Sequence, residues 1–402
     1  MSRLTSVLTS GKARLASPRA RLVGLVTLVG LAASACASNA QQTTLEPQGP
    51  AADKINNLSN ATFIIAGVVF VVVEVGVLYV VWKFRRRDGD DEVPSQLHGN
   101  TKAEIGWTVL PAVILVGLAI PTVATILDLA EEPENALEIR VVGQQWWWSY
   151  DYDIDGDGRH ADDDVNQPGI EFPEEYETDI EVANEMVIPV GVPVYLDIES
   201  RDVIHSFWIP ALNGKKDAVP GRTHNLTLEA DEPGTYVGQC TEYCGLSHAY
   251  MRMSVRALPQ DEYDQWVEDQ LAEAAEPASE LAAEGEQVFG TLCASCHLIE
   301  GVNDDTYDGA DQVSGAAPNL THFASRGTYA GGIFELWKDL DGDGGVETEE
   351  IGVQLETNQL EAWLRNPPEE KALAAADNRG MPNLGLNESQ IDALVAYLTG
   401  LE

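Results

Sequence analysis

The sequence predicts a multidomain membrane protein in which a hairpin of two transmembrane helices precedes an all-β domain and then an all-α domain. Three observations support this fold class. Two long apolar stretches lie in the first third of the chain, short alternating runs follow up to residue 259, and helical patterns occupy the C-terminal part. A chain of 402 residues is long enough for two or three domains.

The N-terminus has the features of a secretory signal. Basic residues precede an apolar run at 22–33, and small residues stand directly before Cys36. A cysteine in this place resembles a bacterial lipobox, in which it becomes the lipidated N-terminus, although the lipobox pattern prefers leucine where Ala33 stands. The alternative is an ordinary signal peptide followed by an incidental cysteine. We expect residues 1–35 to be a lipoprotein-type signal and residues 36–60 to be a polar tether.

Two apolar segments predict membrane-spanning helices. Residues 63–82 hold a single charge, Glu74, and residues 105–127 hold none. A helix needs about 20 apolar residues to cross a bilayer. Lysine and arginine gather between the two segments, and glutamates follow the second. Because basic residues stay on the cytoplasmic side, we predict a hairpin over 61–130 with both of its ends outside the cytoplasm.

The charge balance restricts the partners. The chain has 65 Asp and Glu against 24 Lys and Arg, and its net charge is −41. Such a surface repels nucleic acid and attracts cationic partners, although general solubility explains the charge equally well. An odd number of cysteines, five, does not suggest a disulfide framework. We therefore expect no nucleic-acid partner.

Residues 131–259 have the pattern of a β domain. Apolar and polar residues alternate in runs such as 194–199 and 225–229, and Pro/Gly turns separate these runs. Short alternating runs with such turns predict an antiparallel sandwich or barrel. An acidic insertion interrupts the pattern at about 153–177.

One segment of this domain collects metal-binding side chains. Cys240, Cys244, His248 and Met251 stand close together, and His205 lies 35 residues before Cys240. Thiolates, a thioether and imidazoles suit copper better than calcium, magnesium or manganese, and two thiolates four residues apart can both bridge a pair of metal ions. The alternatives are a disulfide between the cysteines or a structural zinc site, neither of which explains the methionine. A thioredoxin-like copper chaperone would need a βαβ pattern, which this region does not have.

Residues 60–259 resemble subunit II of cytochrome c oxidase. The motifs that carry the resemblance are Trp-Thr-Val-Leu-Pro at 107–111, Gln-Trp-Trp-Trp-Ser-Tyr at 145–150, Asp-Val-Ile-His-Ser-Phe-Trp-Ile-Pro at 202–210, Lys-Asp-Ala-Val-Pro-Gly-Arg at 216–222, and 238–251. The resemblance implies a cupredoxin-like Greek-key fold with a dinuclear copper centre, CuA.

The same resemblance assigns roles to single residues. It implies that copper is bound by the side chains of His205, Cys240, Cys244, His248 and Met251. It also implies that Glu242 binds copper through its carbonyl oxygen and faces a Mg²⁺ shared with subunit I. Trp146 matches the aromatic residue at which electrons arrive, and Trp147 stands where the family usually has tyrosine. Glu104 matches an acid near a proton pathway of subunit I, and its alternative role is a charge at a helix N-terminus.

A second cofactor motif stands near the C-terminus. Cys293-Ala-Ser-Cys296-His297 fits C-x-x-C-H, which attaches c-type haem through two thioethers and an axial histidine. The alternative is a redox pair of cysteines. Export, a preceding helical pattern and a downstream Gly-Met381-Pro favour haem, with Met381 as the second axial ligand. Its alternative is a buried core methionine. A thioether opposite an imidazole raises the reduction potential. We predict an all-α class I cytochrome c domain at 284–402, after a linker at 260–283.

Residues 339–350 fit the calcium-loop pattern D-x-[DN]-x-[DN]-G-x₅-E. The oxygen ligands would come from Asp339, Asp341, Asp343 and Glu350. A similar start at residue 151 is weaker, because that stretch ends in an aspartate at position 12. The alternative for both is an acidic, glycine-rich surface loop.

These features together predict subunit II of a caa-type haem–copper oxidase in the bacterial plasma membrane. Electrons would enter at the haem and pass through CuA to subunit I, where oxygen is reduced to water and protons are translocated. The expected partners are subunits I and III and a donor such as a cytochrome c or a cytochrome bc complex. A freestanding copper–haem module would not need the hairpin. A quinol oxidase subunit II would lack the copper ligands, which excludes it.

Overall fold

The computed structural model describes residues 42–85, 98–154, 180–303, 317–340, 348–373 and 379–402, together with Gly24, Gly89, Gln96 and Val346. Residues 41–402 form one compact unit. Cys36, Asp341 and Asp343 lie outside the described residues, as does most of the acidic insertion.

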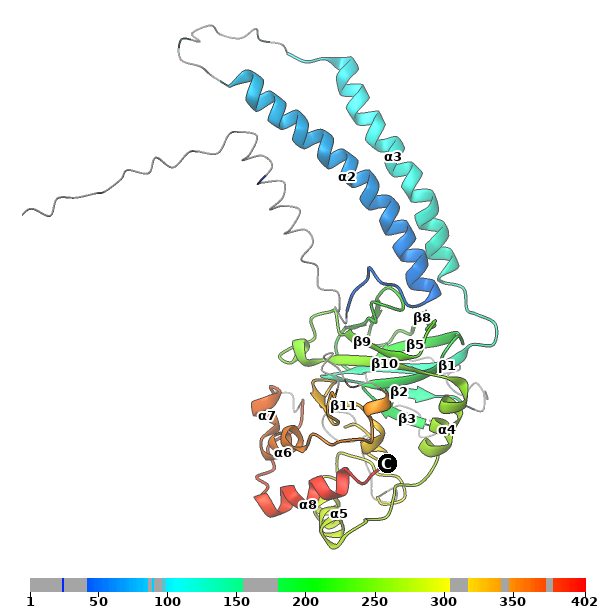
Figure 1. Cartoon of the computed structure of the whole chain (residues 1–402), viewed down its shortest axis with the longest axis vertical. Coiled ribbons are helices and arrows are strands. Elements are labelled where there is room, and N and C mark those ends of the chain that lie inside the picture. Colours follow the sequence, from blue (N-terminus) through cyan, green and yellow to red (C-terminus); the bar gives the residue numbers. More distant parts are fainter. Residues whose placement is uncertain are drawn as a thin grey trace, which may run out of the picture. The chain divides into compact units, whose positions relative to one another are not determined.

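Two long helices, α2 (Pro50–Phe84) and α3 (Thr101–Asp128), run side by side as a hairpin (Figure 1). None of the residues in their apolar windows is buried within the chain. Such exposed apolar surface requires lipid or partner helices around it. Asn100 caps α3 by accepting a hydrogen bond from Ala103 N at 3.2 Å, and Glu104 accepts one from Asn100 N at 3.1 Å. The carboxylate of Glu104 therefore stabilises the start of this helix.

In the part of the chain that the structure describes, ten strands build the β domain, which we call the copper domain after its predicted metal. One sheet has the order β3 (Ile180–Ala183), β2 (Trp147–Tyr152), β1 (Leu137–Gln144), β5 (Val194–Ser200) and β8 (His224–Leu228). A second has the order β4 (Glu185–Pro189), β10 (Arg252–Leu258) and β9 (Gly234–Gln239), and β6 (His205–Phe207) pairs with β7 (Lys216–Ala218).

Two strand pairs of the copper domain are parallel, namely β1 with β5 and β4 with β10. The prediction of an antiparallel sandwich is wrong at these two pairs. Alternation of apolar and polar residues indicates which face of a strand is buried, but it carries no information about the direction of the neighbouring strand. The remaining pairs between named strands of this domain are antiparallel.

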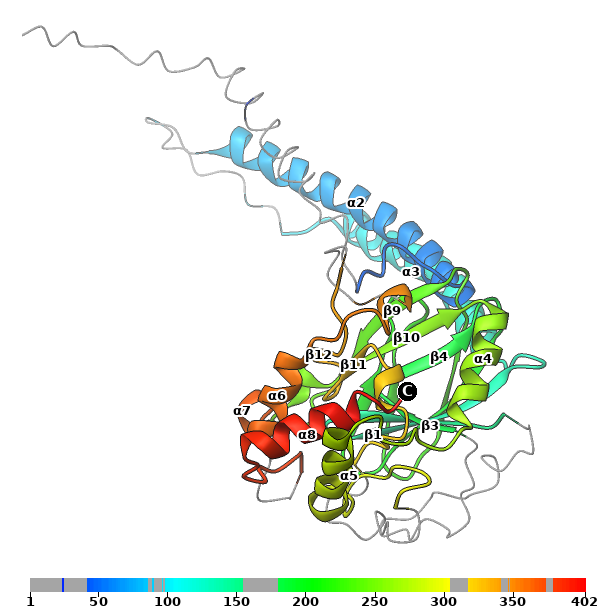
Figure 2. The same cartoon turned by 60° about the horizontal axis from the view of Figure 1, so that its bottom comes forward.

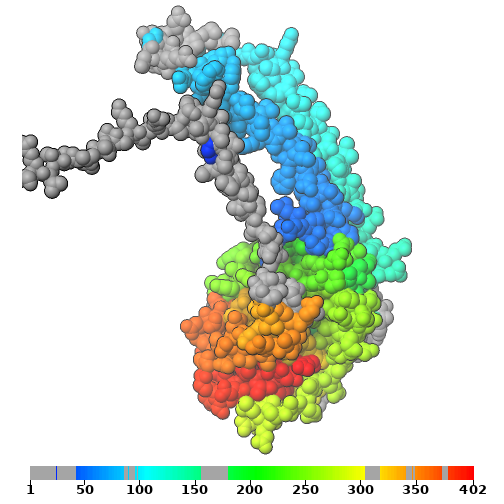
Figure 3. All heavy atoms as spheres, in the orientation of Figure 1, coloured from blue at the N-terminus to red at the C-terminus, as the bar shows by residue number. Residues whose placement is uncertain are grey.

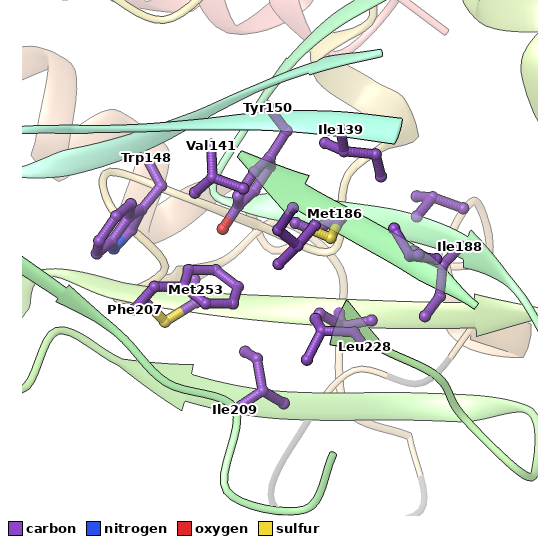
Figure 4. Packing of buried hydrophobic residues seen from close by; sticks show 14 of the residues in the cluster. Ile139, Val141, Trp148, Tyr150, Met186, Ile188, Phe207, Ile209, Leu228 and Met253 are labelled. Carbon is purple, nitrogen blue, oxygen red and sulfur yellow. The ribbon is translucent and has the colours of Figure 1, made fainter. Parts of the chain in front are cut away.

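The core of the copper domain lies between the two sheets. Trp148, Tyr150 and Val141 from β1 and β2 point towards Phe207 and Met253 (Figure 4). The Trp148 and Phe207 rings meet edge to face, with centroids 5.5 Å apart, an arrangement that aromatic pairs prefer. On the opposite face of β1, Arg140 forms a buried ion pair with Glu199 at 2.9 Å.

Helix α4 (Gln260–Gln270) follows the last strand and packs onto the copper domain, with the Trp266 ring centroid 5.3 Å from that of Tyr152. The haem domain then runs from α5 (Glu280–Leu292) to the C-terminus. It contains β11 (Thr328–Tyr329), β12 (Phe334–Glu335), α6 (Thr357–Arg365), α7 (Pro367–Glu370) and α8 (Glu388–Leu398).

Helices α5 and α8 pack closely in the haem domain (Figure 2). A Cβ atom at Gly285 of α5 would lie only 2.1 Å from the carbonyl oxygen of Ala393 in α8. Only glycine allows the two backbones to approach this closely. Asn387 and Gln390 form a capping box at the start of α8. This helix pair holds the segment that follows α5, which carries the cysteine motif.

Candidate functional site

The five predicted copper-binding side chains come from three neighbouring segments of the copper domain. His205 begins β6, Cys240 follows β9, and Met251 directly precedes β10. The pairing of Gln239 with Arg252 joins the two ends of the loop between β9 and β10, and Cys240 N donates to Met251 O at 2.9 Å. The strand register therefore closes the loop so that its sulfur atoms face His205.

The ligand atoms form a compact cluster. Cys240 Sγ lies 3.9 Å from Cys244 Sγ and 4.0 Å from His205 Nδ1. Cys244 Sγ lies 3.5 Å from His248 Nδ1 and 3.8 Å from Met251 Sδ. Each cysteine thus has one histidine beside it, and the carbonyl oxygen of Glu242 lies 3.3 Å from Cys240 Sγ. The donor set combines two thiols and a thioether with two imidazoles, the ligand types that copper prefers.

The two cysteines are free thiols. Their 3.9 Å separation is about twice the length of a disulfide bond, so the disulfide alternative does not describe this structure. The hydrogen bond between the thiols lowers the pKa of Cys240, and the neighbouring His205 lowers it further. A thiolate is the form of cysteine that binds metal.

Asp202 orients one of these ligands. Its Oδ1 lies 2.8 Å from His205 Nε2, so that Nδ1 of the same ring faces the sulfur atoms. Burial raises the pKa of Asp202, but hydrogen bonds from His205 and from two backbone amides outweigh this effect and hold the pKa below its usual value. Asp202 is not among the site residues predicted from the sequence. The available signal was its position three residues before a candidate ligand histidine, since such carboxylates commonly orient metal-bound imidazoles.

Exposed apolar residues surround the copper loop. They are Val203, Ile204, Tyr243, Leu246 and Tyr250, with exposed fractions between 37% and 74%. Apolar side chains gathered on one surface mark contact with another protein. Glu242 is exposed in the same region, and its carboxylate accepts a hydrogen bond from Tyr243 N at 3.2 Å.

A large cavity lies in the haem domain beside the end of α5. Cys293, Cys296, His297 and Met381 all line it, together with the apolar residues Phe289, Leu320, Leu360, Trp363, Leu364, Leu394 and Leu398. The backbone turns tightly after α5, because Cys296 N and His297 N both donate to Cys293 O. The motif cysteines, its histidine and the distant methionine therefore share one apolar cavity.

His297 is prepared for ligation. Its Nδ1 lies 2.8 Å from Pro318 O, which fixes the ring and leaves Nε2 as the free acceptor. Burial lowers the pKa of His297, the hydrogen bond to Pro318 raises it, and the charge of Arg326 lowers it. The net decrease in pKa favours the neutral imidazole that binds a metal. This site fits a c-type haem by its chemistry: two free thiols, a neutral imidazole and a thioether around an apolar space.

The copper domain contributes part of the wall of the haem cavity. Trp146 and Trp147 line it beside the haem-domain residues. The indole Nε1 of Trp146 donates to Cys244 O at 3.0 Å, and its side chain is only 3% exposed. The space-filling view shows the heavy atoms of both domains, from turquoise and green for the copper domain to yellow, orange and red for the haem domain (Figure 3). Trp146 therefore connects the cavity with the copper loop.

The other predicted residues lie apart from these two sites. The remaining histidine of the haem domain, His322, is not among the cavity-lining residues, and its ring nitrogens lie 3.0 Å from Glu402 O and Ala272 O. In the acidic loop, Glu350 accepts a hydrogen bond from Leu340 N at 2.6 Å. Two of the four predicted calcium ligands, Asp341 and Asp343, lie outside the described residues.

Comparison with known proteins identifies the family of the chain. The profile of the family "Cytochrome C oxidase subunit II, periplasmic domain" matches residues 137–258, that of the corresponding transmembrane domain matches 37–125, and that of cytochrome c matches 282–402. The chain is 37% identical over 377 residues to cytochrome c oxidase subunit 2 of Alkalihalophilus pseudofirmus, which covers 91% of this chain and 93% of that protein. The chain belongs to the cytochrome c oxidase subunit II family.

Two further comparisons describe the extent of the similarity. The chain is 31% identical over 399 residues to cytochrome c oxidase subunit 2 of Bacillus subtilis, covering 95% of this chain and 98% of that protein. The crystal structure of the periplasmic domain of subunit II of cytochrome oxidase of Bradyrhizobium japonicum is similar over 34% of this chain and 95% of that chain, with 31% identity and a TM-score of 0.28.

Family membership confirms the predicted fold class and function. The chain is an electron-transfer subunit of a haem–copper oxidase, with an added cytochrome c domain. Its subunit II and cytochrome c domains imply copper and haem as its electron carriers. It is a membrane protein that works in a complex with other oxidase subunits.

Proposed function

We propose that His205, Cys240, Cys244, His248 and Met251, with the carbonyl oxygen of Glu242, hold a dinuclear CuA centre. The supporting observation is a continuous series of neighbouring sulfur and nitrogen donors, in which each atom lies 3.5–4.0 Å from the next. The buried cysteines and the orienting carboxylate of Asp202 fix the ligands before metal arrives. A pre-organised site of this kind changes little in geometry when it gains or loses an electron.

Cys293 and Cys296 are proposed to attach haem covalently, with His297 and Met381 as its axial ligands. Their shared apolar cavity supports this assignment. When bound, haem and copper supply reversible one-electron chemistry. The protein excludes water with the apolar residues of the cavity wall and keeps His297 neutral through burial.

Trp146 is proposed to be the residue through which electrons leave the haem cavity towards copper. Its indole ring faces the cavity and donates to the backbone of a copper ligand, Cys244. In this chain the donor to Trp146 would be the chain's own haem domain. A tethered donor acts at high effective concentration and avoids a bimolecular docking step.

We also propose further partners and ions. Glu242 presents an exposed carboxylate near the apolar surface around the copper loop, which supports a Mg²⁺ shared with subunit I. Glu104 would serve a proton pathway in addition to its capping hydrogen bond. The other proposed partners are subunit III and an electron donor, either a cytochrome c or a cytochrome bc complex. We also propose that a calcium ion binds at 339–350. The proposed location is the bacterial plasma membrane. We also propose that Cys36 carries a lipid. Mass spectrometry of the N-terminal peptide would detect this lipid.

The cofactor assignment is tested by composition and spectroscopy of the purified oxidase. We expect covalent haem that resists acid–acetone extraction and that disappears in Cys293→Ala/Cys296→Ala. Met381→Ala should keep the haem but lower its reduction potential, because the thioether is lost. The copper site should show mixed-valence electron spin resonance, and Cys240→Ser should abolish it. Extractable haem, or a mononuclear copper signal, would refute the assignment.

A further inference from the structure

One lysine of the haem domain reaches into the copper domain. Lys371, directly after α7, donates from its Nζ to the carbonyl oxygen of Trp146 at 2.6 Å and to that of Ala330 at 2.8 Å. A single amino group therefore joins the loop that carries Trp146 to two separate segments of the haem domain. Buried carbonyl groups need such partners, because an unsatisfied one costs free energy.

The backbone at Gly331 lies very close to this amino group and to the carbonyl oxygen of Trp146. Gly331 has φ +81°, and a Cβ atom there would lie 2.1 Å from Lys371 Nζ and 2.8 Å from Trp146 O. The backbone of the same turn is tied to the copper domain, because Arg252 N donates to Gly331 O at 2.9 Å. Glycine is the residue that combines a positive φ with this lack of space.

A second contact stands next to the lysine. Ser247 Oγ, in the copper loop, donates to Ala372 O at 2.8 Å. The segment that leads from α7 towards Met381 is thus held to the copper domain at two successive residues, Lys371 and Ala372. Meanwhile the Trp146 ring is held from the other side by Cys244 O at 3.0 Å.

We propose that Lys371 is a positioning residue for electron transfer, a latch that holds the haem domain on the Trp146 loop so that the haem cavity and the copper loop keep one fixed relation. This inference rests on the proposed electron route through Trp146. The latch keeps Trp146 covered, at 3% exposure. An external donor then has no access to this residue while the domains are docked, and its electrons enter through the haem.

Replacing the lysine in the intact oxidase tests the latch. Lys371→Met removes both hydrogen bonds and keeps an apolar stem of similar length. We expect the rate of electron transfer from haem to copper, followed after photoreduction of the haem, to fall at least about tenfold, because docked molecules become fewer. Hydroxyl-radical footprinting should show greater oxidation of Trp146, while the optical spectrum of the haem and the copper spin-resonance signal stay unchanged.

Two further variants complete the test: one disturbs the same contact from the glycine side, and the other is a control. Gly331→Ala keeps the lysine in the sequence but puts a methyl group where its amino group and Trp146 O lie, so it should produce the same two changes. Lys338→Met, a substitution of the same chemistry elsewhere in the haem domain, should produce neither. Wild-type rate or wild-type labelling of Trp146 in both Lys371→Met and Gly331→Ala would overturn the latch while leaving the relay intact. Absence of haem-to-copper transfer in the wild type would overturn both.

Discussion

At the scale of the single residue, the copper ligands depend on neighbours that bind no metal. Asp202 accepts a hydrogen bond from the ring nitrogen of His205 that faces away from the cysteines. It also accepts one from Gln145 N at 2.8 Å, beside Trp146. One carboxylate thus sets both the tautomer of a copper ligand and the position of the loop that reaches the haem cavity.

Asp202→Asn tests this role. The amide keeps the shape of the side chain but loses its charge, so the imidazole is held less firmly. We expect copper affinity to fall about 10- to 100-fold, the usual cost of losing such an orienting partner. Copper retained after dialysis against graded chelator measures the effect. Asp231→Asn, on an exposed turn of the same domain, is the control, and equal copper retention in the two variants would contradict the role.

Residue types and spacing carried most of the information on the two sites. The thiolates, imidazoles and thioethers of the candidate sites were all visible in the sequence because their chemistry is distinctive. Lys371 and Asp202 were not, because a lysine or an aspartate acquires such a role only through what it contacts in the fold. The capping role of Glu104 was visible as an alternative, since it is local to its helix.

At the scale of the element, the packing of α5 on α8 positions the haem attachment motif. A methyl group at Gly285 would overlap with Ala393 O. Gly285→Ala should therefore destabilise the haem domain by about 1–3 kcal/mol through overpacking. Gly290→Ala in the same helix meets nothing within 4 Å and should stabilise it by about 0.5–1 kcal/mol. Thermal unfolding followed by haem absorbance distinguishes the two, and equal melting temperatures would refute the packing argument.

The acidic loop at 339–350 gives a prediction of its own. If it binds calcium, the haem domain should melt at a higher temperature with Ca²⁺ than with chelator, with half-saturation at about 10⁻⁴–10⁻³ M. Asp339→Ala and Glu350→Gln should remove this difference. The same melting temperature with Ca²⁺ and with chelator, or an unchanged calcium response in the variants, would leave the loop an acidic surface segment.

Element types were predictable, whereas the direction of some strands was not. The apolar lengths of α2 and α3 and the alternation in β5 and β8 are local properties, and the structure follows them. The parallel pairs β1 with β5 and β4 with β10 arise from crossover connections between strands distant in the sequence. Local periodicity cannot indicate those connections.

At the scale of the whole molecule, the two cofactor domains meet at Trp146, and this contact should depend on pH. Burial lowers the pKa of Lys371 from 10.5 to about 7, and the charge of Cys244 partly opposes this change. Between pH 7 and pH 10.5 the lysine therefore binds more protons in the undocked form than in the docked form. Raising the pH in this range favours the docked form by at most about tenfold per pH unit. Labelling of Trp146 should fall from pH 7 to pH 9 in the wild type and stay level in Lys371→Met. Labelling of Trp146 that does not change with pH in either protein would contradict the proposed pH dependence of docking.

The contact between the two domains could not be predicted from the sequence. Lys371 and Trp146 are 225 residues apart, and nothing in either local pattern indicates that they meet. The sequence indicated two cofactor modules on one chain, and from this alone a flexible tether would serve as well as a docked pair.

The central claim is that one chain carries electrons from its haem site through Trp146 to its copper site. The most direct measurement is photoreduction of the haem in the purified oxidase, followed by simultaneous recording of haem and copper absorbance. We predict that haem oxidation and copper reduction share one rate constant, that this constant does not change with protein concentration, and that Trp146→Leu lowers it. A rate proportional to protein concentration, or reduction of copper without oxidation of the haem, would contradict the account.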